Sequence, residues 1–189
     1  GTPVLGDLSV SGEVDVYQFD GEAGDTVWLS LTETQQIDSG FGPQLTLHRP
    51  DGAIQTYLYA TDPVVLTLGQ PGRYTLRVYD SGGDRGSYRL RLEWLAPTSK
   101  QCITQPVGCG TPVIGALDTN DQTLWVFDGA AGDTVWLSLT ETQQIDSGFG
   151  PQVAVHRPDG AVQAYVYATD PVVLTLGQPG RYTLRVHDS

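Results

Sequence analysis

The sequence predicts an all-β protein made of two tandem antiparallel β-sandwich domains of the jelly-roll or immunoglobulin-like kind. Two observations lead to this fold class. Apolar and polar residues alternate with a period of two along most of the 189 residues, and helical spacing is not sustained anywhere. The chain also repeats itself: residues 24–81 align with residues 132–189 without a gap and differ at seven positions. The repeat predicts two copies of one fold.

The repeat divides the chain into a first domain at residues 1–95, a linker at 96–109 and a second domain at 110–189. The hexapeptide GTPVLG at residues 1–6 returns as GTPVIG at residues 110–115. After the aligned part, the first copy continues with GGDRGSYRLRLEWL, and the second has no such continuation in this sequence. The second domain is therefore predicted to lack its last strand.

Seven strands are predicted in the first domain, at residues 14–19, 26–32, 44–48, 53–59, 63–68, 73–79 and 87–95. Turn residues separate them, and Pro50-Asp51-Gly52 predicts a hairpin between the third and fourth strands. Seven short strands at a spacing of roughly ten residues favour a sandwich over a barrel.

Four positions on the predicted hairpin change in one direction between the copies. Val in the second copy replaces Leu45, Leu47, Ile54 and Leu58. Because these residues alternate along two paired strands, all four are predicted to lie in the core. Either a co-adjusted core patch or drift among interchangeable strand-forming residues explains the pattern.

The strand at residues 87–95 carries an apolar face that alternates with charged residues. This face consists of Tyr88, Leu90, Leu92 and Trp94. Because the second copy lacks the strand, one hypothesis is that it completes a neighbouring repeat, or another copy of the chain, by β-strand addition. The alternative is that the strand packs in its own domain.

The charge of the chain excludes some classes of partner. Acidic residues outnumber basic ones 22 to 10, whereas a nucleic-acid surface needs clustered Lys and Arg. Residues 1–109 hold 13 acids and 7 bases and residues 110–189 hold 9 and 3, so each part carries a formal charge of −6. The apolar runs are too short for insertion into a membrane.

Three stretches resemble the bacterial pre-peptidase C-terminal domain. Residues 15–19 with 24–29 match its D-x-Y-x-F opening and following strand, residues 45–52 its middle strand and turn, and residues 71–78 with 87–90 its closing strands. The resemblance implies a non-catalytic β-sandwich module of secreted proteins, often appended to peptidases. Its relatives include collagen-binding modules of bacterial collagenases, some of which bind calcium. An extracellular or cell-surface location is therefore expected.

The sequence offers little support for catalysis. His48 and its equivalent His156 stand beside the hairpin turn, and His187 replaces Tyr79. No nucleophile, zinc-protease or phosphate-loop motif is present. We therefore predict that the chain is not an enzyme.

Two cysteines lie in the linker between the domains. Cys102 and Cys109 are separated by six residues that include Pro and Gly, and no further Cys or His completes a zinc set. This spacing predicts a disulfide that stiffens the linker and indicates an oxidising location. The alternative is two thiols that each pair with another chain.

Calcium is the one cofactor that the sequence suggests. Asp38 and its equivalent Asp146 lie in an acidic loop and are the candidate ligands. No EF-hand or nonapeptide calcium signature is present, so solvated acidic loops are the simpler interpretation.

Aromatic residues on the outer faces of strands are the candidate contacts for a ligand or partner. In the first domain these are Trp28, Tyr57 and Tyr59, and in the second Trp136, Tyr165 and Tyr167. Such rings can stack on sugars or anchor a protein contact. For Trp28, the alternative is that the loop at residues 34–43 covers the ring.

Two functions remain open at this point. The first is a structural or adhesive repeat unit of a secreted or cell-surface protein, which forms a filament or stalk with neighbouring repeats or copies of itself. The second is a carbohydrate- or protein-binding accessory module of a secreted hydrolase.

Overall fold

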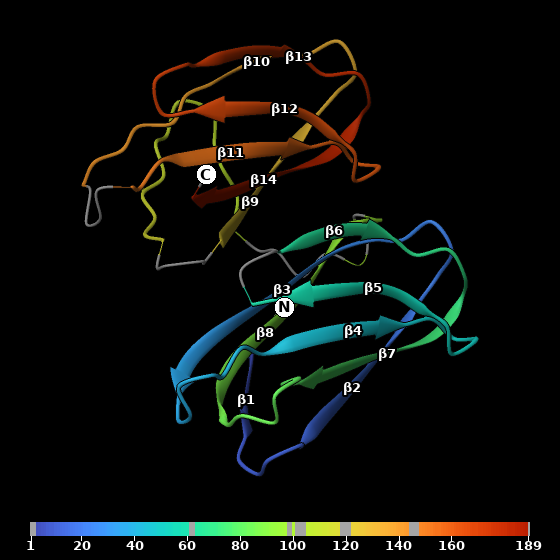
Figure 1. Cartoon of the computed structure of the whole chain (residues 1–189). Helices are drawn as coiled ribbons and strands as arrows, with labels where there is room; N and C mark the ends of the chain where they lie inside the picture. The colour runs from blue at the N-terminus through green and yellow to red at the C-terminus, as the bar shows by residue number, and fades with distance from the viewer. Residues whose placement is uncertain are drawn as a thin grey trace. The chain divides into compact units, whose positions relative to one another are not determined.

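The computed structural model describes residues 3–60, 63–97, 100, 105–117, 122–143 and 148–188 (Figure 1). The chain divides into two compact units, Gly1–Trp94 and Leu95–Ser189. The described residues form strands, turns and loops, and the predicted all-β antiparallel sandwich class is confirmed. A helix long and apolar enough to cross a membrane is not found among them.

The first unit consists of two four-stranded sheets. One has the order β1-β8-β3-β6, with bounds Val4–Leu8, Gly86–Ala96, Thr26–Gln36 and Val64–Thr67. The other has the order β2-β7-β4-β5, with bounds Val14–Gly21, Gly72–Tyr79, Gln44–His48 and Ile54–Tyr59. All seven predicted strands are present, and β1 is additional. The antiparallel hairpin of β4 and β5 is also confirmed.

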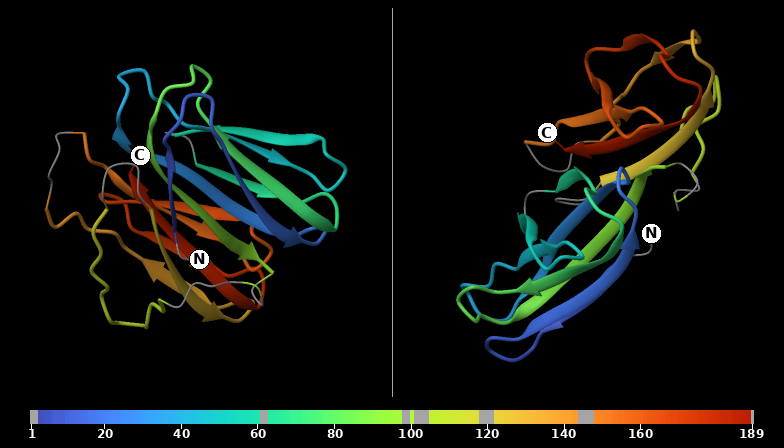
Figure 2. Two further views of the ribbon diagram at one scale, coloured as in Figure 1. Left: turned by 90° about the horizontal axis from the view of Figure 1, so that it is seen from below. Right: turned by 90° about the vertical axis from the view of Figure 1, so that its right-hand side faces the viewer.

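The two sheets of the first unit lie face to face and enclose its core (Figures 1 and 2). Each sheet contributes buried residues, among them Val27, Leu29, Leu31, Leu45, Leu47, Leu76 and Val78. The predicted apolar face of β8 lies in the same core: Tyr88 and Leu90 are buried, and Leu92 and Trp94 pack against the cluster. The strand thus completes its own unit, which corrects the hypothesis that it is donated to a neighbouring repeat.

The second unit has fewer strands than the first. Its four-stranded sheet has the order β12-β11-β14-β9, with bounds Val162–Tyr167, Pro151–His156, Gly180–Asp188 and Gln122–Gly129. Its other sheet contains only β10 (Thr134–Leu137) and β13 (Val172–Thr175) within the described part of the chain. Its core includes Val153, Val155, Val166, Leu174, Leu176, Tyr182 and Leu184.

The hairpin turns of the two copies have the same backbone conformation. Gly52 and Gly160, which end the Pro-Asp-Gly turns, both have a φ of 85°. Residues other than glycine rarely adopt this left-handed region. The turn sequence therefore specifies the same hairpin twice, independently of the rest of each unit.

One residue predicted in the core is exposed. Ile54 is 41% exposed and its counterpart Val162 is 40% exposed, whereas the other three hairpin positions are buried in both units. The register between β4 and β5 shifts between Leu47 and His48, where β5 begins. This bulge beside the turn leaves Ile54 outside the core.

Candidate functional site

The β4–β5 hairpin and its counterpart, β11–β12, each place one strand at the edge of a four-stranded sheet. A pair of tyrosines lies on each of these edge strands, β5 and β12. Tyr57 and Tyr59 of β5 are 59% and 55% exposed, and Tyr165 and Tyr167 of β12 are 48% and 49% exposed. Residues two apart on a strand share a face, so each pair presents two neighbouring rings to solvent. These four predicted contact residues are accessible in both units.

The outer face of this strand is the same in both copies, although its inner face is not. Residues 54, 56 and 58 of β5 all differ from their equivalents in β12, whereas residues 55, 57 and 59, which alternate with them, are identical in β12. The Gln55 amide donates to the Thr67 carbonyl at 2.9 Å, and Gln163 donates to the Thr175 carbonyl at 2.8 Å. The same hydrogen bond therefore holds the edge strand, and its tyrosines, in each unit.

Equivalent tryptophans differ strongly in exposure. Trp28 is 1% exposed, and the guanidinium carbon of Arg91 lies 5.5 Å from the centroid of its ring. Trp136 is 65% exposed, as is Val173, its cross-strand partner. The predicted contact role of Trp28 is corrected, because its ring is not accessible and a guanidinium of β8 lies over it. Trp136 remains a candidate.

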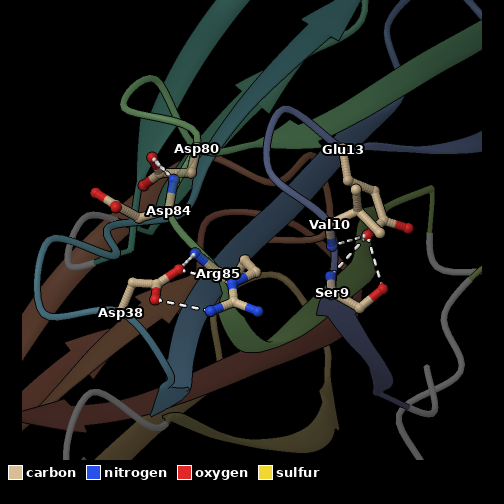
Figure 3. Close-up of polar contacts among 7 residues, drawn as sticks. All are labelled: Ser9, Val10, Glu13, Asp38, Asp80, Asp84 and Arg85. Atoms are coloured by element: carbon tan, nitrogen blue, oxygen red, sulfur yellow. Dashed lines mark hydrogen bonds and ion pairs between the residues drawn. The ribbon is translucent and has the colours of Figure 1, made fainter.

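Acidic side chains hold the loops at one end of the first unit (Figure 3). Asp80 accepts hydrogen bonds from the backbone N–H groups of Gly42, Gly82 and Asp84 at 2.8, 2.7 and 3.0 Å. Partial burial alone would raise the pKa of Asp80, but these hydrogen bonds outweigh it and hold the pKa below its usual value. This aspartate joins the loop after β3 to the loop after β7.

Asp38, one of the two candidate calcium ligands, pairs with an arginine. Arg85 Nε and Nη2 donate to the two carboxylate oxygens of Asp38 at 2.9 and 3.1 Å (Figure 3). Hydrogen bonds from this side chain hold the pKa of Asp38 below its usual value. The described residues contain no group of three or more His, Cys, Asp or Glu residues that could hold a metal ion. Asp146, the second candidate, lies outside the described residues.

A glutamate orders a neighbouring turn at the same end (Figure 3). Glu13 Oε2 accepts hydrogen bonds from the backbone N–H groups of Val10 and Ser9 at 3.0 and 2.6 Å. These bonds lower the pKa of Glu13. Sequence reasoning missed this residue and Asp80. Both could have been found from the sequence, because each is an acidic residue within or beside a turn that contains Gly and Ser.

Two tyrosines and an aspartate form a hydrogen-bonded group beside the core of the first unit. The Tyr88 hydroxyl of β8 donates to the Asp15 carboxylate of β2, and the Tyr17 hydroxyl lies 2.8 Å from that of Tyr88. Burial raises the pKa of Tyr88, and its bonds with Asp15 and Tyr17 raise it further. The alternation of apolar residues predicted a buried Tyr88, but it carries no information about polar partners on another strand.

The structure does not support the predicted disulfide. Cys109 is an exposed free cysteine, and Cys102 lies outside the described residues. The backbone around this segment pairs differently: the N–H of Val107 donates to the carbonyl of Val126 at 2.8 Å. The contact ties residues 105–107 to β9 rather than leaving them as a free linker.

A family model for the bacterial pre-peptidase C-terminal domain matches residues 13–80, which contain β2 to β7. The similarity to this family is shown for residues 13–80. Pre-peptidase C-terminal domains are non-catalytic accessory domains known from secreted proteases such as collagenase. The resemblance carried by the sequence motifs is therefore confirmed, and the second unit repeats most of the same pre-peptidase C-terminal sequence.

Two solved structures are similar to about half of the chain. The pre-peptidase C-terminal domain of collagenase from Bacillus anthracis is 24% identical, with 49% of this chain and 88% of that chain covered and a TM-score of 0.41. PliG, a periplasmic inhibitor of g-type lysozyme from Aeromonas hydrophila, is 14% identical, with 49% and 84% covered and a TM-score of 0.40. A comparison with curated proteins gave no match.

Proposed function

We propose that this chain is a non-catalytic accessory module of a secreted protein, and that it binds an extracellular carbohydrate or protein through its two tyrosine pairs. The observation that carries the proposal is the outer face of β5 and β12: its residues are identical in the two units and its tyrosines are exposed in both, whereas the residues that alternate with them differ. The match of residues 13–80 to a family of accessory domains supports the non-catalytic, extracellular part.

The chemistry of the pair suits a flat, amphipathic ligand. A tyrosine ring offers an apolar face for stacking and a hydroxyl that both donates and accepts hydrogen bonds. Two rings fixed on one strand lose little conformational freedom on binding. Two such pairs in one chain also raise the avidity for a repetitive ligand, because the second contact becomes intramolecular.

A glycan array and a panel of immobilised extracellular matrix proteins test the proposal directly. The wild-type chain is compared with Y57S/Y59S, Y165S/Y167S and the quadruple variant. Each double variant should lose avidity, and the quadruple variant should lose binding to the same ligand. Val16→Ser is the matched control, because Val16 is an apolar residue of β2 that is 56% exposed. Unchanged binding by the quadruple variant would overturn the assignment of the tyrosines.

A second candidate is a structural or adhesive repeat unit. The near-identity of residues 24–81 and 132–189, with a charge of −6 in each part of the chain, favours a long array of similar acidic units. The full-length gene distinguishes the two functions. Many further copies would favour the array, whereas a peptidase domain upstream would favour the accessory role.

A further inference from the structure

The outer face of the sheet β2-β7-β4-β5 in the first unit carries few charges (Figure 1). Every second residue of each strand points away from the core and lies on this face. The charged side chains among these outward residues are Asp20, Arg73 and Arg77. Two arginines and one aspartate give the face a formal charge of about +1, whereas the whole chain carries −12. The face is therefore a nearly neutral, slightly basic area of an acidic molecule.

The guanidinium of Arg77 is available for a ligand. Arg73 pairs with Asp20, with 3.1 Å between its Nε and a carboxylate oxygen. Within the part of the chain that the structure describes, the side chain of Arg77 makes neither an ion pair nor a hydrogen bond, and it is exposed. A guanidinium presents five N–H donors in a rigid fork that matches a carboxylate. Arg77 therefore suits an anionic group that the chain itself does not supply.

A sequence difference between the two units explains why Arg77 has no partner. In the second unit the equivalent Arg185 donates through Nη1 to Oε1 of Gln122 at 3.0 Å. Val14 occupies the position of Gln122 in the first unit, because the two residues pair with equivalent residues of β7 and β14. Valine has no side-chain acceptor. The first unit thus leaves free the guanidinium that a glutamine binds in the second.

Arg77 lies in one row with a tyrosine of the proposed binding site. Arg77 stands opposite Thr46 on β4, and Thr46 stands opposite Tyr57 on β5. Because neighbouring strands lie about 4.8 Å apart, the Cα atoms of Arg77 and Tyr57 are about 10 Å apart. Thr46, the short residue between them, is 5% exposed, whereas the longer side chains on both sides are exposed. The row places a cation and an aromatic ring where one small ligand can contact both.

We propose that this row recognises a glycan that ends in a sugar with a carboxylate, either a sialic acid or a uronic acid. The inference rests on the proposed function, because Tyr57 stacks on a sugar ring of the same ligand. Arg77 donates two parallel hydrogen bonds to the carboxylate. Such charge-assisted bonds are roughly twice as strong as those between neutral groups. Arg77 therefore selects the acidic sugar, and Tyr57 contributes affinity for the neighbouring ring.

The charge of the chain favours a ligand with a single carboxylate. One unpaired arginine neutralises one anionic group, and a chain with a formal charge of −12 repels a ligand that carries many. A polyuronate, a sulfated polysaccharide or an acidic protein surface is therefore disfavoured. A terminal acidic sugar combines one carboxylate with several hydroxyls. The side-chain amides of Gln18 and Gln44, on the same face, can form hydrogen bonds with such hydroxyls.

An NMR titration of the isotope-labelled full chain tests the inference with matched pairs of ligands. Sialyllactose is compared with lactose, and cellobiouronic acid with cellobiose, so that the two kinds of acidic sugar are distinguished. At least one acidic ligand should bind about tenfold more tightly than its neutral counterpart. Its methyl ester, which lacks the charge, should lose the same factor. This comparison changes the ligand only and leaves the fold of the chain untouched.

Variants of the chain test the role of the arginine. Arg77→Gln should weaken binding of the acidic ligand about tenfold and leave binding of the neutral sugar unchanged. Val14→Gln should also weaken it, because it supplies the acceptor that occupies the equivalent guanidinium in the second unit. Arg73→Gln is the matched control: it makes the same change in charge on the same strand and face, but removes an arginine that is already paired.

The Y57S/Y59S variant separates this inference from the proposed function. If it loses binding at the first unit while acidic and neutral ligands bind the wild-type chain equally, the inference is overturned and the proposed function stands. If it retains full binding at the first unit, both are overturned. An equal loss in Arg73→Gln and Arg77→Gln also overturns the inference. Binding of hexaglutamate, but of neither acidic sugar at millimolar concentration, would overturn it in favour of an acidic protein.

Discussion

The sequence TVWLSLTETQQ folds differently in the two units. In the first it forms the 11-residue strand β3, with Val27, Leu29 and Leu31 buried in the core. In the second it forms the four-residue strand β10, followed by residues without regular structure as far as residue 143. The local sequences are identical, so the cause lies elsewhere in the chain. The first unit has β8 beside this strand, and the second has no equivalent among its described residues.

The hairpins of the two units show the opposite behaviour. β4 and β5 pair with the same register and the same bulge as β11 and β12, although six residues differ between them. The comparison separates two kinds of element. The hairpin is specified by its own turn, whereas the length of β3 depends on a partner that is distant in sequence.

The largest expected effect comes from removing the core contacts of β8. Tyr88→Ala should destabilise the first unit by about 3–5 kcal/mol, because it creates a cavity and leaves Asp15 without its hydrogen bond. Calorimetric unfolding should show a lower midpoint for one unit only. Ser87→Ala on the outer side of the same strand is the control. An equal loss in both variants would show that the side chain of Tyr88 does not matter.

Matched leucine truncations measure the difference between the two copies. Leu29→Ala removes a side chain that is 0% exposed and should cost about 2–5 kcal/mol, whereas Leu137→Ala removes its partly buried equivalent and should cost clearly less. Urea unfolding of the two variants supplies both values. Equal losses would mean that the second unit is as tightly packed around this strand as the first.

A smaller effect is expected from the loop carboxylates. Asp80→Ala removes the acceptor for three backbone N–H groups and should destabilise the first unit by about 1–3 kcal/mol. The pKa of Asp80 is lower in the folded state than in the unfolded state, where it is near 3.8. Its carboxylate therefore contributes fully to the free energy of unfolding above the unfolded pKa, and this contribution is lost as the pH falls through the folded pKa. Unfolding measured across this acidic range should show a smaller pH dependence for the variant.

The smallest effect is expected at the tyrosine pairs. Tyr57→Ser and Tyr165→Ser should each change stability by less than about 0.5 kcal/mol, because both side chains are mainly exposed. Thermal unfolding followed by circular dichroism checks this directly. A large loss in one unit alone would show that the two edge strands are not equivalent, and would complicate their use in binding experiments.

The sequence predicted the strands whose own residues alternate in polarity and are bounded by turn residues. Period-two alternation and turn residues located all seven expected strands, but β1 was missed. Its sequence alternates poorly because Gly6 lies over the ring of Tyr88, where a Cβ would approach within 2.3 Å. The equivalent residues 113–117 form no strand, so pairing with β8, rather than local sequence, makes β1 a strand.

The sequence predicted only part of the candidate binding surface, because alternation carries information about the strand itself and not about its neighbours. Alternation correctly placed both tyrosine pairs on an outer face, since nothing beyond the strand itself decides that orientation. It failed for Trp28, where a guanidinium from a strand distant in sequence lies over the ring. It also failed for Ile54, where a bulge breaks the alternation.

The identical sequences of residues 26–42 and 134–150 have a consequence for folding. During folding, β8 meets two segments of one sequence, and the native pairing must be selected by kinetics as well as by contacts. Synthesis from the N-terminus completes the first unit before residues 134–144 are made. The order of the two repeats along the chain therefore favours the native pairing of β8 with β3 over pairing with the identical residues 134–144.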